Sequence, residues 1–221
     1  MGETEPYRHS ARYRQSEGQD PADKRLRSPV FAYNSPPLIA ALAPYLTERT
    51  GTVLEIGAGT GQHAAAFQLA FPGLDWRASD PDPIHRASIA AWAAEYGLPD
   101  HAPLDIDASG DWGAGFDDLT AVISLNVIHI APMRVAEGII AGAGKALASG
   151  GFLMFYGPFT EDGTHISPSN AAFDAGLRTD NPDWGVRDLG DITDLAKTAG
   201  LAADRVVPLP SNNRLAVFRK G

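Results

Sequence analysis

Short β-prone runs alternate with segments of helical spacing along most of the chain. The β-prone runs lie at residues 53–56, 74–79, 103–106, 119–125 and 152–156. Apolar and small residues with the periodicity of a helix fill the intervals, at residues 64–70, 84–96 and 136–147. The resulting β-α-β-α-β-β-α-β order predicts an α/β protein with a doubly wound, mostly parallel sheet.

The two flanks of this pattern predict further elements. Ahead of the first strand, Ser35 is suited to cap a helix whose first position is Pro36, and Pro44 should kink or shorten that helix. After the fifth strand, residues 160–188 form a long irregular stretch, and their aromatic, amide and charged side chains predict an ordered lid. The chain then closes with a helix at residues 191–199 and a hairpin of residues 204–209 and 214–219.

The composition excludes several classes of site and partner. Of the 221 residues, 44% are hydrophobic, which is enough for a single large core. The formal charge is −9 and the pI is near 5.0, which disfavours a nucleic-acid binder because such a surface is basic. Cysteine is absent, so the sequence offers no disulfide, no thiolate metal site and no cysteine nucleophile, and we expect no metal in the site.

The sequence also predicts a domain boundary and a location. Residues 1–27 are polar and are predicted to form a mobile arm, and residues 28–221 are predicted to form one domain. No apolar run approaches the roughly 18 residues of a membrane span, and the N-terminus lacks a signal pattern. We therefore expect a cytoplasmic protein with a small-molecule partner and without a nucleic-acid or membrane partner.

The glycine-rich stretch after the first strand predicts the ligand site. Gly57, Gly59 and Gly61 stand at alternate positions, where the backbone can take positive φ angles and a ligand can lie directly on it. A dinucleotide-binding turn would read G-x-G-x-x-G, and Gln62 stands where its third glycine belongs. Glu55, at the end of the strand, would repel a phosphate and suits a cationic ligand such as the amino-acid end of S-adenosylmethionine. The alternative is an ordinary glycine-rich turn.

Acidic residues follow the second strand. A carboxylate can accept two hydroxyl donors at once, so an acid at this position can bind a ribose diol. Asp80 and Asp82 can also cap the next helix. Because Pro83 follows Asp82, we assign the capping role to Asp82 and ribose binding to Asp80.

The loop after the fourth strand supplies the best candidate for a general base. Loops at the carboxyl ends of parallel strands form the ligand crevice, so Asn126 and His129 should face the cofactor or the substrate. An imidazole titrates near pH 6.5 and can take a proton from an attacking oxygen or nitrogen. The alternatives for His129 are a wall of the cofactor site and a hydrogen-bonded histidine of the core.

Several blocks of the sequence together resemble one known family. They are Leu54–His63, Asn126–Ile130, Tyr156–Phe159, Ser169-Asn170 with Phe173-Asp174, Trp184–Asp188 and Asn212-Asn213. The E-x-G-x-G-x-G turn resembles the first motif of class I methyltransferases. The whole set resembles an uncharacterised methyltransferase-like family of bacteria and eukaryotes, of the methyltransferase-like 26 type, over about residues 28–219. Where those relatives tend to carry Arg-Asn-Lys, this chain has Tyr33-Asn34-Ser35, so a charge-based role for this segment has no support.

The resemblance implies a fold, a cofactor and its contacts. It implies a Rossmann-like, seven-stranded sheet in the order 3-2-1-4-5-7-6 with helices on both faces, and S-adenosylmethionine as methyl donor with S-adenosylhomocysteine as product. Asp105 stands where an adenine amino group is bound, with a surface turn as its alternative, and Trp112 either lines the adenine pocket or covers the sheet edge. Asn34 either reaches the cofactor or forms a simple turn. The expected cofactor-binding residues are Glu55, Gly57, Ala58, Gly59, Gly61, His63, Asp80, Pro81, Asp105, Ile106, Asn126, Val127 and Asn34.

The methyl acceptor is left open by the sequence. The expected catalytic residues are His129 and Tyr156, and the expected substrate-side residues are His165, Asn170, Asp174, Trp184, Arg187 and Asn213. Arg187 either clamps a substrate carboxylate or pairs with Asp188 or another acid of the lid. The leading hypothesis is methyl transfer to a small molecule, and the alternative is a protein that binds S-adenosylmethionine or S-adenosylhomocysteine without turnover. Nicotinamide-dependent oxidoreduction is disfavoured by the glycine spacing and by Glu55.

Overall fold

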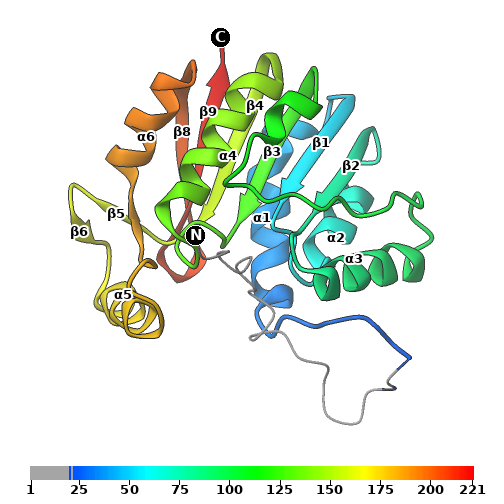
Figure 1. Ribbon diagram of the computed structural model, residues 1–221, viewed down its shortest axis with the longest axis horizontal. Coiled ribbons are helices and arrows are strands. Elements are labelled where there is room, and N and C mark those ends of the chain that lie inside the picture. Colours follow the sequence, from blue (N-terminus) through cyan, green and yellow to red (C-terminus); the bar gives the residue numbers. More distant parts are fainter. Residues whose placement is uncertain (1–19, 21) are drawn as a thin grey trace, which may run out of the picture.

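A six-stranded sheet in the order β2-β1-β3-β4-β9-β8 runs through the part of the chain that the computed structural model describes, residue 20 and residues 22–221 (Figure 1). Its strands are β1 (Gly51–Ile56), β2 (Leu74–Ser79), β3 (Leu119–Leu125), β4 (Leu147–Gly157), β8 (Leu201–Leu209) and β9 (Asn213–Lys220). The first four of these pair in parallel, whereas β9 is antiparallel to both β4 and β8. The predicted α/β fold with a mostly parallel sheet is confirmed.

The predicted third strand is the one departure from the expected sheet. Residues 103–106 join β2 only through an isolated parallel bridge between Ser79 and Leu104, so the seven-strand prediction is wrong by one strand within the described residues. The run is four residues long, Pro103 brings no N–H donor, and Asp105 is exposed, so little pairing can form. The other six strands follow the predicted order.

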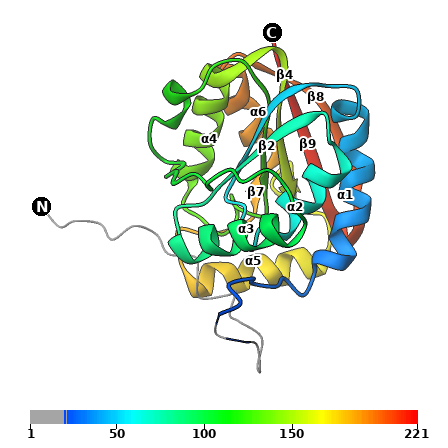
Figure 2. The same ribbon diagram turned by 90° about the vertical axis from the view of Figure 1, so that its right-hand side faces the viewer.

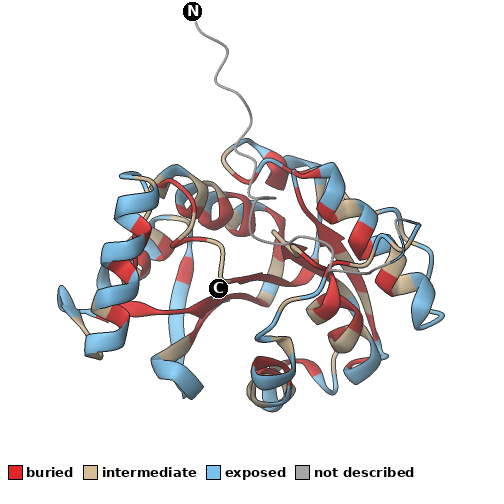
Figure 3. Ribbon diagram, turned by 90° about the horizontal axis from the view of Figure 1, so that it is seen from below, coloured by how far each residue is buried: buried red, intermediate tan, exposed pale blue. Residues whose placement is uncertain are grey.

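Helices cover both faces of this sheet (Figure 2). They are α1 (Phe31–Leu46), α2 (Gln62–Ala70), α3 (Pro83–Glu95), α4 (Met133–Ala146) and α6 (Leu189–Thr198). One apolar cluster joins the sheet to α1, α2 and α3, and another joins it to α4 and α6. Alternate strand residues feed the two clusters, as with Val53 and Leu54, because successive side chains of a strand point to opposite faces. Buried residues therefore line the strands and the inner helix faces (Figure 3).

Helix α1 begins earlier than predicted. Asn34 N donates to Val30 O at 2.9 Å, and the helix runs through Pro36 and Pro44 to Leu46. Capping by Ser35 is therefore a wrong prediction, and Pro44 does not end the helix. Three leucines at four-residue spacing, Leu38, Leu42 and Leu46, are fully buried, and this packing outweighs the hydrogen bonds that proline removes.

The predicted mobile arm is wrong for its last six residues. Leu26 is 3% exposed, its backbone N–H and C=O both pair with side chains of α3, and Arg25 forms an ion pair with Glu95. Residues 22–27 therefore pack on the domain. The rest of the predicted arm, except for residue 20, lies outside the described residues.

The predicted lid contains regular structure. Residues 159–188 form a three-stranded sheet, in the order β6-β5-β7, and one helix, α5. The elements are β5 (Phe159–Glu161), β6 (Thr164–His165), α5 (Pro168–Asp180) and β7 (Arg187–Asp188). An irregular lid was therefore a wrong prediction. The buried face of α5 consists of Asn170, Asp174 and Leu177, so no apolar period marks the helix, although Ser167-Pro168 supplies its cap.

Candidate functional site

The carboxyl ends of β1 and β3 point to the lower edge of the molecule, where α5 and the segment before α1 also lie (Figure 1). At this edge, Gly57, Gly59 and Gly61 all have positive φ angles, of 72°, 56° and 80°. A Cβ atom added at Gly57 would lie 2.6 Å from Val127 Cγ2, and one at Gly61 would lie 2.6 Å from Ile89 Cα. The turn therefore excludes side chains both by its conformation and by close packing.

Asp80 holds the glycine turn in place. Its carboxylate is 5% exposed and accepts hydrogen bonds from Gly59 N and Asp82 N, each at 2.9 Å, and Oδ1 lies 3.1 Å from His85 Nδ1. Oδ2 has one of these partners, so it keeps a lone pair for a further donor such as a hydroxyl. Asp82 accepts from Ile84 N at 2.8 Å and caps α3, so the predicted capping role is confirmed.

Glu55 lies beneath the turn in a buried position. It is 1% exposed, and its Oε2 accepts a hydrogen bond from Trp76 Nε1 at 2.8 Å. Burial, aided by the negative charge of Asp80 and opposed by the hydrogen bond from Trp76, raises the pKa of Glu55 from 4.5 to about 7. A cation near this carboxyl would favour its charged form. Trp76 was not predicted to take part, and its only signal in the sequence is its place in the neighbouring strand.

The loop after β3 packs tightly under α5. Asn126 adopts a positive φ of 57°, and its N–H donates to Tyr156 O at 2.8 Å. His129 is 4% exposed, and its ring lies 5.6 Å from that of Phe173 in an edge-on arrangement. A Cβ atom added at Gly157 would approach His129 Nδ1 to 3.2 Å. The structure thus brings His129 together with the end of β4.

Tyr156 and Asn213 meet at the same edge. Asn213 Nδ2 donates to the Tyr156 hydroxyl at 2.9 Å, and burial raises the pKa of this phenol above its ordinary value of 10.0. The hydroxyl therefore keeps its proton at neutral pH. Because its oxygen accepts from Asn213, its proton remains available for another acceptor.

Helix α5 is fastened to its surroundings by two of the predicted substrate-side residues. Asp174 accepts from Val186 N at 2.7 Å and from Arg178 Nε at 3.1 Å, and it lies 3.4 Å from His165 Nε2. Asn170 Nδ2 donates to Asn212 O at 3.3 Å. A polar cleft of about 470 Å³ adjoins α5 and is lined by Met133, Thr160, Gly163, His165, Asp174, Arg178, Val186, Arg187, Asp188 and Asp191.

Arg187 makes contacts with backbone carbonyl groups that were not predicted. Its Nε donates to Ile128 O at 3.0 Å, and its Nη2 donates to Ala131 O at 2.6 Å and to Asp183 O at 2.9 Å. Ile128 and Ala131 lie on either side of His129 in the loop after β3, and Asp183 lies in the loop before β7. A guanidinium carries several N–H donors, so it can bind all three carbonyl groups at once. Arg187 thus holds the His129 loop against the lid rather than pairing with Asp188.

Other predicted residues lie apart from this cluster. Asp105 is exposed and pairs with Arg86 at 3.0 Å. His63 packs between the rings of Phe31 and Phe67, and burial lowers its pKa from 6.5 to about 4.

The remaining predicted positions have backbone or helix surroundings. Trp184 is half-buried, and its backbone N–H donates to Asn181 O. Asn34 is buried in the first turn of α1. Trp112 Nε1 donates to Gly138 O in α4 at 3.1 Å, so its ring covers α4 rather than an adenine pocket at the glycine turn.

Comparisons with known proteins agree with this fold. Residues 25–220 match a family described as "Protein of unknown function (DUF938)". Three similar solved structures are an O-methyltransferase family protein from Burkholderia thailandensis (17% identity, TM-score 0.74, covering 85% of this chain and 56% of that one), the mitomycin 7-O-methyltransferase MmcR (19%, 0.72, 87% and 54%) and an O-methyltransferase family 2 protein from Planctomyces limnophilus in complex with apigenin (18%, 0.71, 85% and 56%).

These structural similarities have a limited reach. All three identities are low, so the likeness concerns the fold, and the chain spans little more than half the length of each of these proteins. Among residues 20 and 22–221, no helix is long and apolar enough to cross a membrane.

Proposed function

The chain belongs to the DUF938 family of proteins of unknown function, and from its site we propose that it transfers a methyl group from S-adenosylmethionine to a small molecule. Glu55 carries this proposal. A buried carboxyl directly under the glycine turn, with a pKa raised to about 7, disfavours a phosphate and favours a cationic ligand group. The amino-acid end of S-adenosylmethionine has such a group.

The residues around the turn fit the rest of this cofactor. Asp80 retains a free lone pair at the end of β2, in the position from which a carboxylate accepts ribose hydroxyls. Asp105 is exposed and directly follows Leu104, which forms the bridge to β2. Its carboxylate is proposed to accept a hydrogen bond from an adenine amino group after its ion pair with Arg86 has broken. The ligand is proposed to contact the backbone of Gly57, Ala58, Gly59 and Gly61. The three glycines have no side chain that would hold the ligand away from this backbone. His63, Pro81, Ile106, Asn126, Val127 and Asn34 complete the proposed contacts.

The acceptor side is proposed to lie between His129 and Tyr156. When bound, S-adenosylmethionine supplies an electrophilic methyl group, so the protein chiefly aligns the acceptor and shields it from water. His129 is proposed to take a proton from the acceptor, and the Tyr156 hydroxyl to donate a hydrogen bond to it. Phe173 covers the His129 ring, and the cleft beside α5, with His165, Asp174 and Arg187 in its lining, offers space for a polar acceptor.

The alternative function is cofactor binding without turnover. One observation favours it: His129 is packed between Phe173 and Gly157, and Tyr156 is engaged by Asn213, so both candidate catalytic groups already have protein neighbours. Such a protein would bind S-adenosylmethionine or S-adenosylhomocysteine and methylate nothing.

Calorimetric titration with S-adenosylmethionine, S-adenosylhomocysteine and NAD tests the cofactor. We expect the first two to bind and NAD not to bind, and binding of NAD alone would overturn the proposal. Incubation of a metabolite extract with methyl-labelled S-adenosylmethionine then separates the two functions, because only an enzyme labels a product. If the protein binds S-adenosylmethionine and S-adenosylhomocysteine but no labelled product forms, the result supports the alternative.

The role of His129 is tested by substitution. We expect His129→Ala to slow methyl transfer by about 10² or more while leaving the affinity for S-adenosylhomocysteine within a few-fold. His101→Ala is the matched control, since His101 pairs with Asp75 in β2, outside the His129 loop. Equal losses of transfer and affinity would make His129 a cofactor contact.

A further inference from the structure

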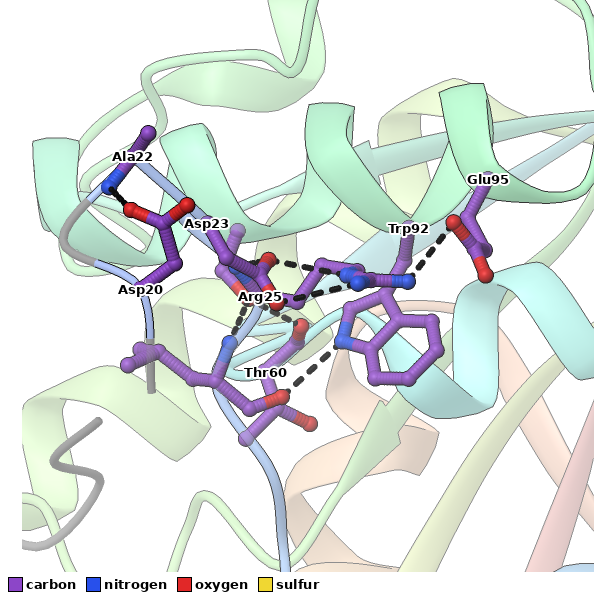
Figure 4. A network of polar contacts seen from close by, with 9 residues as sticks. Asp20, Ala22, Asp23, Arg25, Thr60, Trp92 and Glu95 are labelled. Carbon is purple, nitrogen blue, oxygen red and sulfur yellow. Dashed lines mark hydrogen bonds and ion pairs between the residues drawn. The ribbon is translucent and has the colours of Figure 1, made fainter. Parts of the chain in front are cut away.

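The segment before α1 crosses α3 next to the glycine turn. We call residues 22–28 the N-terminal strap; Figure 4 shows its contacts with Trp92 and Glu95 of α3, and it also shows Thr60 of the glycine turn nearby. Leu26 is its anchor, since Leu26 N donates to Ser88 Oγ at 2.8 Å and Leu26 O accepts from Trp92 Nε1 at 2.9 Å. Both backbone groups of a buried residue are thus satisfied by side chains of one helix.

Charged residues of the strap add to this contact. The guanidinium groups of Arg25 and Arg27 lie 5.4 Å and 4.9 Å from the centre of the Trp92 ring, within the range of cation–π attraction. Arg25 also pairs with Asp23 at 2.8 Å and with Glu95 at 2.6 Å. The strap is therefore attached to α3 through three consecutive residues, Arg25, Leu26 and Arg27.

The same residues that hold the strap also touch the glycine turn. Ser88 is fully buried, and its hydroxyl accepts from Leu26 N and donates to Thr60 O at 2.7 Å. At the far end of the strap, Ser28 N donates to Gln62 Oε1 at 2.6 Å, directly after Gly61. One hydroxyl therefore joins the strap to the turn, and consecutive hydrogen bonds of this kind strengthen each other.

We propose that Ser88 and Trp92 are positioning residues of the cofactor site, which fix the Thr60–Gln62 part of the turn by holding the strap on α3. Docking of the strap and binding of a ligand at the turn are then coupled, and the coupling is reciprocal: bound ligand holds the strap down as much as the docked strap improves affinity. The inference rests on the proposed function for the identity of the ligand.

Trypsin measures the docking of the strap in the full chain. Lys24, Arg25 and Arg27 are cleavage sites inside the strap, and a protease needs an extended segment that has left α3. We expect saturating S-adenosylhomocysteine to slow cleavage at these sites about fivefold or more. An unchanged rate in a protein that binds S-adenosylhomocysteine would overturn the inference.

Two variants test the positioning role. Trp92→Phe removes the indole N–H and keeps an aromatic ring beneath the arginines, and Ser88→Ala removes the hydroxyl that joins strap and turn. Trp92→Phe loses one hydrogen bond and Ser88→Ala loses two. Loss of one such hydrogen bond corresponds to about a fivefold change in an equilibrium, so we expect S-adenosylhomocysteine to bind about fivefold less tightly to Trp92→Phe and at least as weakly to Ser88→Ala, and the strap to be cleaved faster in both.

Trp112→Phe is the matched control. Trp112 is also buried and its indole donates to a backbone carbonyl, that of Gly138, but on the α4 side of the sheet. We expect this variant to lose thermal stability as Trp92→Phe does, with affinity and strap cleavage within twofold of the unsubstituted protein. If Trp92→Phe also lowers only the stability, the strap is merely structural and the inference fails. Absence of S-adenosylhomocysteine binding in the unsubstituted protein would instead refute the proposed function.

Discussion

Replacing Glu55 by Gln should make the protein more stable at alkaline pH. The glutamine oxygen can still accept the hydrogen bond from Trp76 Nε1, so the substitution removes the charge and little else. Between pH 4.5 and about 7, the folded protein keeps a proton on Glu55 that the unfolded chain has released. The free energy of unfolding therefore falls as pH rises through this window, and this fall is absent from the variant.

The magnitude follows from the pKa of the buried carboxyl. The pKa of Glu55 is 4.5 in the unfolded chain and about 7 in the folded protein. At about 1.4 kcal/mol for each pH unit, this difference lowers the free energy of unfolding by about 3 kcal/mol at a pH where Glu55 is ionised in both states. Most of this, about 2 to 3 kcal/mol, should develop between pH 5 and pH 8. For a domain of this size it corresponds to a rise of about 5 to 10 °C in Tm for the variant relative to the parent at pH 8.

Urea unfolding of Glu55→Gln and of the unsubstituted protein at pH 5, 6, 7 and 8 measures this effect. All other titrating groups are shared, so they cancel in the difference between the two proteins. Glu137→Gln, at an exposed position of α4, is the control and should change stability by less than about 0.5 kcal/mol at every pH. Parallel stability profiles of the Glu55 variant and the parent would refute the reasoning, because they would mean that Glu55 ionises alike in the folded and unfolded states.

Three further outcomes follow from the geometry. Gly61→Ala should lower the free energy of unfolding by about 3 kcal/mol, because it adds a clash with the backbone of Ile89 to the strain of a left-handed residue. Gly97→Ala, at φ 61° with open space around it, should lower it by only about 1 kcal/mol. Equal losses for the two variants in urea unfolding would contradict the clash. Arg187→Lys should cost about 2 to 3 kcal/mol, because a single ammonium nitrogen cannot occupy the places of both Nε and Nη2, from which arginine reaches the three carbonyl groups. Arg178→Lys should cost less than about 1 kcal/mol, and the Tm values of the two variants decide. His63→Phe should flatten the loss of stability in acid, because the unfolded chain binds a proton below pH 6.5 that folded His63 binds only near pH 4. The unfolding free energies of parent and variant, measured at pH 6.5, 5.5 and 4.5, should diverge by about 2 kcal/mol over this range as the pH falls.

Local patterns predicted most of the central fold. The range 74–79 coincides with β2, and Asp82-Pro83 marks the start of α3, because a cap and a proline at the first turn act on their own neighbours. The alternation of β-prone runs and helical segments predicted the doubly wound, mostly parallel sheet, and the order of its strands was implied by the family resemblance. The glycine turn was found because its spacing reflects a backbone conformation, and all three glycines have positive φ angles.

Elements without a local signal were missed. Helix α5 buries Asn170 and Asp174, so its inner face lacks the apolar period on which the prediction depended. Residues 22–27 were predicted to belong to a mobile arm because they are polar. In the structure, Ser88 and Trp92 bind the backbone of Leu26, and the Trp92 ring also faces the Arg27 guanidinium. For Arg187 the sequence predicted either a substrate clamp or an ion pair with a lid acid, because its nearby sequence could not show that three carbonyl groups converge on it.

The sequence by itself determined the α/β class, the order of elements along the chain and the turn at which a ligand is expected, since these follow from periodicity and from backbone preferences of single residues. Only the tertiary structure decided what surrounds that turn: Trp76 on Glu55, Gly59 on Asp80, and Ser88 between Thr60 and Leu26. These partners lie 21 or more positions apart, and which distant groups meet depends on how helices and strands pack, which no short window of sequence contains.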